Sequence, residues 1–103
     1  MDNNIKELTI SLMKSNWPKT EKIAEELFNI GGEDAKKALL EGLNGKRHAI
    51  RTACIHYLAK FNDESTVDYF RKHLNDSSYE TRMEAKSAIK SLTGEDVLTA
   101  RGE

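Results

Sequence analysis

A recurrence every 31 residues is the feature that most constrains how this chain folds. Asn3, Asp34, Ser65 and Asp96 follow one another at that interval, and each is a residue type favoured at helix N-caps. Apolar residues recur at the same step in three columns: Leu12, Leu43 and Leu74; Leu27, Leu58 and Ile89; Ile30, Phe61 and Leu92. A fixed period of this length is typical of stacked helical repeats.

Each unit divides into two amphipathic helices. First helices are expected over 18–30, 48–61 and 79–92, and second helices over 4–14, 35–44 and 66–75, from apolar residues at helical spacing. Pro18 suits a first helical turn, and Gly31, Gly32 and Gly45 are expected to end helices through left-handed backbone. The connections are short, so neighbouring helices must be antiparallel. The sequence therefore predicts an all-α fold, a short right-handed α-solenoid of about six helices.

The two ends of the array differ from its middle. The chain begins on a second helix, and Asp96 would cap another for which only seven residues remain. Because so short a helix is unstable without packing, we expect a repeat domain over residues 1–96 and a frayed tail over 97–103. In the last first helix, Lys86 and Lys90 replace apolar residues of earlier repeats, beside Arg82. This polar face is expected to be a solvated cap of the solenoid.

Composition excludes several classes of function. The net charge is −1 and the pI is about 6.3, so the chain lacks the accumulated cations that bind nucleic acid or anionic membrane. Cys54 is the only cysteine, which rules out an intramolecular disulfide. No stretch approaches the roughly 20 apolar residues of a membrane span, and the N-terminus does not resemble a signal peptide. We expect a cytoplasmic protein without membrane contact.

The repeat also has a recognisable internal pattern. In the segment from Ile50-Arg51-Thr52-Ala53-Cys54 to Val67, an apolar residue and Arg precede small residues, Leu58 and an acidic turn, and a second helix then ends at Leu74-Asn75-Asp76. Thr81-Arg82 through Asp96 matches its first half. The pattern resembles the HEAT-like repeats of phycobilisome-lyase-type proteins. The resemblance implies a helical solenoid whose second helices line the concave side, in scaffolds, adaptors, lyase accessory proteins or DNA-repair glycosylases.

Two columns of residues suggest local roles. Arg51 and Arg82 occupy the same repeat position, and we expect an inter-repeat ladder of bonds to acidic turn residues such as Asp76, in preference to a phosphate ligand. Trp17, His48 and Tyr79 begin successive first helices. They form either a surface stripe for peptide binding or hydrophobic staples that fix each helix entry, and the sequence favours staples.

No catalytic, cofactor-binding or metal-binding residues are predicted. Cys54 falls in an inward column and is expected to be a small core residue. His48, His56 and His73 lie on different elements. The carboxylate pairs Glu21/Glu25 and Glu80/Glu84 are expected to be solvated on exposed helix faces, where nothing separates their pKa values.

The outward columns of the second helices are the predicted binding surface. Their charges change sign along the groove, which favours a mixed polar protein partner over a polyanion; a groove without a partner is the other reading. We therefore predict a non-enzymatic interaction or scaffold module, monomeric or weakly dimeric through Ile10 and Met13. The alternative is a DNA-binding or DNA-repair accessory module that contacts phosphates through Arg82, Lys86 and Lys90. The predicted partner-binding residues are Lys6, Ile10, Lys37, Glu41, Asp68, Tyr69 and Lys72.

Overall fold

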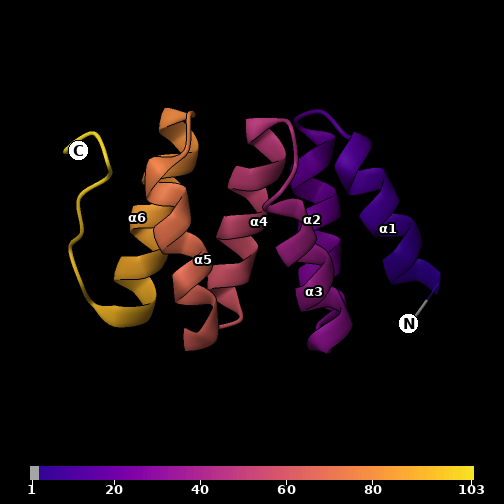
Figure 1. Ribbon diagram of the computed structural model, residues 1–103. Helices are drawn as coiled ribbons and strands as arrows, with labels where there is room; N and C mark the ends of the chain where they lie inside the picture. Colours follow the sequence, from indigo (N-terminus) through magenta and orange to yellow (C-terminus); the bar gives the residue numbers. More distant parts are fainter. Residues whose placement is uncertain (1–2) are drawn as a thin grey trace.

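The helices stand side by side in a row that measures 41 × 25 × 17 Å (Figure 1). This computed structural model describes residues 3–103. Across that range, α2 packs against α4 and α4 against α6, while α1, α3 and α5 pair with them as the second layer. The predicted all-α helical repeat is thus confirmed. The α-helices of the described range are α1 (Asn3–Lys14), α2 (Lys19–Ile30), α3 (Gly32–Gly42), α4 (His48–Lys60), α5 (Val67–Lys72) and α6 (Tyr79–Thr93).

Helix boundaries agree with the sequence for the first helices and, within one residue, for α1, whereas those of α3 and α5 differ. The 3-10 turns η1 (Glu64–Thr66) and η2 (His73–Asn75) extend α5 at both ends. Asp34 does not cap α3, because the helix already begins at Gly32 and Asp34 lies in its first turn. Ser65 is not a cap either, since the Asp63 carboxylate accepts the Ser65 N–H. Local hydrogen bonds therefore move the expected caps by a few residues.

The glycines at the helix ends act in two ways. Gly31 and Gly32 have φ values of 73° and 83°, which confirms the predicted left-handed turn. Gly45 lacks a positive φ, so the prediction of a left-handed residue there is wrong. A Cβ at Gly45 would instead lie 2.7 Å from Cγ2 of Ile50. Close approach of the backbone to Ile50 is the reason that position needs glycine.

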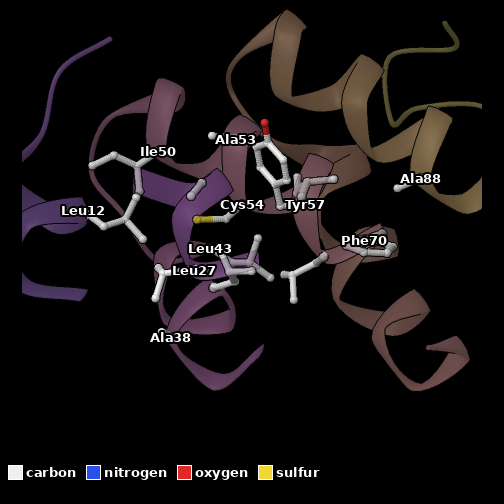
Figure 2. Packing of buried hydrophobic residues seen from close by; sticks show 14 of the residues in the cluster. Leu12, Leu27, Ala38, Leu43, Ile50, Ala53, Cys54, Tyr57, Phe70 and Ala88 are labelled. Atoms are coloured by element: carbon white, nitrogen blue, oxygen red, sulfur yellow. The ribbon is translucent and has the colours of Figure 1, made fainter. Parts of the chain in front are cut away.

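The core lies between the two layers and follows the 31-residue columns. Leu27, Leu58 and Ile89, one from each first helix, are fully buried. Figure 2 shows Cys54 within the buried hydrophobic cluster, which also includes Ile50 and Leu43. Burial raises the pKa of the Cys54 thiol to about 12. The thiol is therefore neutral, as expected for a core residue and unlike a reactive thiolate.

The segment after α6 is not frayed. It runs back beside α6 (Figure 1), where Ala100 N donates to Leu74 O at 3.0 Å and Thr99 is 5% exposed. The expectation of a frayed 97–103 tail is therefore wrong. That expectation considered only how stable a short helix is, whereas this segment is irregular and held by hydrogen bonds to the last repeat. We call residues 95–103 the C-terminal strap.

Arginines link successive repeats. Arg51 makes the expected two-pronged contact with Asp76, through Nε and Nη2 at 2.9 and 3.0 Å, and its Nη1 donates to Gly45 O at 2.9 Å. One repeat later, Arg82 Nη1 donates to Asp76 O at 2.9 Å, the equivalent of the bond to Gly45. The carboxylate of Arg82, however, is Glu103, at 2.7 and 3.2 Å. Glu103 of the strap thus takes the part in the ladder for Arg82 that Asp76 takes for Arg51.

These ion pairs predict a loss of stability in acid. The Arg82 hydrogen bond lowers the pKa of Glu103 to about 2, and the Lys36 hydrogen bond lowers that of Asp63 to about 2. For Asp76, burial acts to raise the pKa, but hydrogen bonds from Arg51 and the Ser78 N–H lower it overall. Lowered folded-state values mean stability that is present above pH 4 to 5 and lost as the pH falls towards 2.

We expect the urea midpoint to be constant from pH 7 to 5 and to fall steadily from pH 5 to 2.5. In Glu103→Gln the midpoint at pH 7 is lower, and the acid decline is shallower because one of the three carboxylates no longer titrates. If the urea midpoint of this variant fell with pH as steeply as that of the wild type, titration of Glu103 would not contribute to the loss of stability in acid.

Candidate interaction surface

The second-helix face is exposed, as predicted, but the hollows of the surface lie elsewhere. Ile10 is 50% exposed and Tyr69 42% exposed, with Lys72 Nζ 5.7 Å from the Tyr69 ring centre. The seven predicted residues remain a predicted binding surface, and the weak dimer through Ile10 and Met13 remains a prediction. Exposed with them on α1, α3 and α5 are Lys6, Lys37, Glu41 and Asp68.

The other layer carries the exposed aromatic column. Trp17 is 70% exposed and Tyr79 60% exposed, each beside the start of a first helix, and His48 at the start of α4 is exposed too. The staple interpretation is therefore wrong, because a staple buries its ring against the following turn. The period-31 spacing sets these rings on the same edge of α2, α4 and α6. The column is a surface stripe.

A hollow of about 570 Å³ lies along α4 between α2 and α6. We call it the α4 groove. Its floor is made by the small residues Ala49, Thr52 and Ala53, and Thr52 Oγ1 shares a hydrogen bond of 2.8 Å with Thr81 Oγ1 of α6. The groove is lined by Trp17, Glu21, His48, Ala49, Thr52, Ala53, His56, Glu80 and Glu84.

Carboxylates give the α4 groove its charge. Glu80 Oε2 lies 4.0 Å from His48 Nε2, and Glu84 Oε2 lies 3.5 Å from His56 Nδ1. The Glu84 side chain is 27% exposed and that of Glu80 is 73% exposed. Glu21, in the first turn of α2, also lines the groove. Glu21 and Glu80 are exposed, as expected, and with the less exposed Glu84 they line one hollow.

Glu80 and Glu84 are four residues apart, which places both on one face of α6, whereas Trp17 lies in the turn before α2 and Glu21 in the first turn of α2. The four-residue spacing of Glu80 and Glu84 was visible in the sequence. The orientation of α2 and α6 on either side of α4, which brings Glu21 to the same hollow as these two carboxylates, was not.

A second hollow, of about 690 Å³, adjoins the α4 groove at the inter-repeat turns. It shares Trp17, His48 and Ala49 with the groove and adds Lys46 and Arg47. The first-helix layer is therefore acidic along α4 and basic at the turn that precedes it.

The basic stripe of α6 is occupied by the strap. Arg82 is 3% exposed and bonded to Glu103, Lys86 Nζ donates to Glu103 O at 2.9 Å, and Lys90 Nζ lies 3.0 Å from Asp96. The solvated-cap expectation is therefore wrong for Arg82, whose guanidinium is buried against Glu103, whereas Lys90 is exposed as expected. The DNA-binding alternative loses Arg82 as a phosphate contact.

The remaining polar candidates are structural. Within residues 3–103 no group of three or more His, Cys, Asp or Glu side chains is placed to hold a metal ion. The His73 ring nitrogens face the carbonyl oxygens of Tyr69 and Leu43, at 2.9 and 3.2 Å, so this ring links α5 to the end of α3. Across the same range, every helix is too short or too polar to cross a membrane.

Comparison with known proteins supports the architecture. A family model described as HEAT repeats matches residues 5–98, and the chain therefore belongs to the HEAT repeat family. Repeats of this family commonly mediate protein–protein interaction and are generally not catalytic. No curated protein and no solved structure matches the chain.

Proposed function

We propose that this chain is a non-enzymatic protein-interaction module that binds a segment of another protein along the α4 groove. The observation that carries this proposal is the exposure of Trp17 and Tyr79, 70% and 60%, along the first-helix layer that holds the groove. Large aromatic side chains are costly to leave in water and are enriched in binding hot spots. Exposed rings beside a preformed hollow favour a partner that covers them.

The second-helix face is the competing surface for the same function. Ile10 and Tyr69 would be its apolar contacts, and its alternating charges suit a protein partner. It has neither the hollow nor the tryptophan of the α4 groove. We therefore place the principal contact on the first-helix layer.

Selection of displayed random peptides against the folded chain tests this proposal. Peptides selected on the wild type are expected to bind the Trp17→Ser/Tyr79→Ser variant at least about tenfold more weakly, because both rings are lost from the contact. The matched control is Ile10→Ser/Tyr69→Ser, which removes two exposed apolar side chains from the other layer and is expected to leave affinity unchanged.

The opposite pattern, with affinity lost only in the control, would move the site to the second-helix face. Failure to select any peptide that the Trp17→Ser/Tyr79→Ser change weakens would overturn the α4 groove as the binding surface. Circular dichroism of each variant establishes that it remains folded.

A further inference from the structure

The α4 groove combines negative charge with an exposed tryptophan. The residues that line it, all within the described range, include Glu21, Glu80 and Glu84 and no Lys or Arg. Opposite charges across an interface steer association and fix the choice of partner. An acidic peptide or a nucleic-acid strand would meet three carboxylates here. The negative charge of the α4 groove therefore favours a positively charged ligand.

The side chains that accompany the carboxylates suit a cation on a long stem. The indole ring of tryptophan is the best aromatic partner for an ammonium or guanidinium group. Ala49 and Ala53 give the floor a small apolar surface, on which the methylenes of a lysine or arginine can lie while the charged end reaches the carboxylates. Glu84, at 27% exposed, is the more shielded from water of the two α6 carboxylates, since Glu80 is 73% exposed.

We propose that the α4 groove recognises a basic segment of its protein partner, with a Lys or Arg side chain lying against Trp17 and directed at Glu80 and Glu84. This inference rests on the proposed function and adds the chemistry of the partner to it. Lys46 and Arg47 at the neighbouring turn place positive charge at the end of the groove where Trp17 lies. The charged end of the bound side chain is therefore directed away from that turn, past Trp17 and towards Glu84.

Trp17 is the only tryptophan of the chain, so its fluorescence reports binding at this position. The probes are three blocked nonapeptides of equal length, in which alanine alternates with lysine, with glutamine or with glutamate. The lysine peptide is expected to change the Trp17 emission with a saturable curve and to bind more weakly as salt is raised. The glutamine peptide is expected to bind at least about fivefold more weakly, and the glutamate peptide more weakly still.

The carboxylates are tested by Glu80→Gln/Glu84→Gln, which keeps shape and hydrogen-bonding capacity. This variant is expected to lose about fivefold in affinity for the lysine peptide, because each partly exposed charge pair contributes modestly. Its affinity for the glutamine peptide should not change. The control, Glu7→Gln, removes an exposed carboxylate from α1 in the other layer and should bind as the wild type does.

Equal binding of the lysine and glutamine peptides, no binding of the lysine peptide, or wild-type affinity in Glu80→Gln/Glu84→Gln would each overturn this inference. The proposed function is decided separately by the peptide selection. Selected peptides that need Trp17 and Tyr79 but lack basic residues would retain the groove as a binding surface and refute its preference for cations. Selected peptides that ignore both rings would refute the groove itself.

Discussion

The Asp76→Ala variant is expected to lose about 3 kcal/mol of unfolding free energy at pH 7, because it leaves the Arg51 guanidinium unpaired in a largely buried site. The Asp76 side chain is 7% exposed and that of Arg51 15% exposed. The substitution also removes the acceptor of the Ser78 N–H, a bond of 2.9 Å. The loss should appear in urea unfolding as a lower midpoint with an unchanged slope, and as a fall in Tm of more than about 10 °C.

A double-mutant cycle separates the pair from the general cost of substitution. With Arg51→Met and Arg51→Met/Asp76→Ala, the coupling energy is expected to be about 2 kcal/mol, since removing the cation relieves the penalty of leaving it unpaired. Asp68→Ala, at an exposed aspartate of α5, is the control and should stay within about 0.5 kcal/mol of the wild type. Additive losses in the cycle would show that the ladder contact adds nothing beyond each residue alone.

The Gly42→Ala variant is expected to lose about 2 kcal/mol, although alanine normally favours a helix over glycine by up to about 1 kcal/mol. A Cβ at position 42 would lie 2.2 Å from Sγ of Cys54 and 3.2 Å from Cδ2 of Leu12. Overpacking a core in this way costs typically about 1–3 kcal/mol, which exceeds the gain in helix propensity. Urea unfolding of the purified variant measures the balance.

Removal of the Cys54 sulfur is expected to rescue the stability of Gly42→Ala. In a Cys54→Ala background the sulfur is gone, so Gly42→Ala is expected to be neutral or slightly stabilising there. Glu41→Ala, at the exposed neighbouring position of α3, is the control for helix propensity and should change stability by less than about 0.5 kcal/mol. If Gly42→Ala remained equally destabilising without the sulfur, the close contact with Cys54 would not be its cause.

The repeat architecture was predictable because it depends on periodic burial. The Leu27, Leu58 and Ile89 column is fully buried, and the first helices begin and end within about a residue or two of the predicted positions. The Arg51–Asp76 contact was predictable for the same reason, since the repeat places an acidic turn residue where the arginine of the preceding first helix can reach it. Helix caps were less predictable, because Asp63 and Gly31 compete with the residues that the period selects.

From the sequence alone, the binding surface was predicted on the second-helix face, and the hollow between α2 and α6 was not foreseen. The alternating charges of the second helices favoured a binding surface around Tyr69 and Ile10. Trp17 and Tyr79 were interpreted as hydrophobic staples. Whether a ring at a helix start folds against its own helix or stands in solvent depends on neighbouring helices. Glu21 and Glu84, on different helices 63 residues apart in the chain, line one hollow only because α2 and α6 flank α4.

The sequence by itself determined the period, the helical class and the columns that face the core, because burying apolar residues at helical spacing has few alternative solutions. The tertiary structure decided how the last repeat ends and where the surface is hollow. Glu103 reaches Arg82 because the strap turns back after Gly94, whose φ of 79° reverses the chain. Such contacts between residues distant along the chain depend on the packed geometry of several helices, which no local pattern contains.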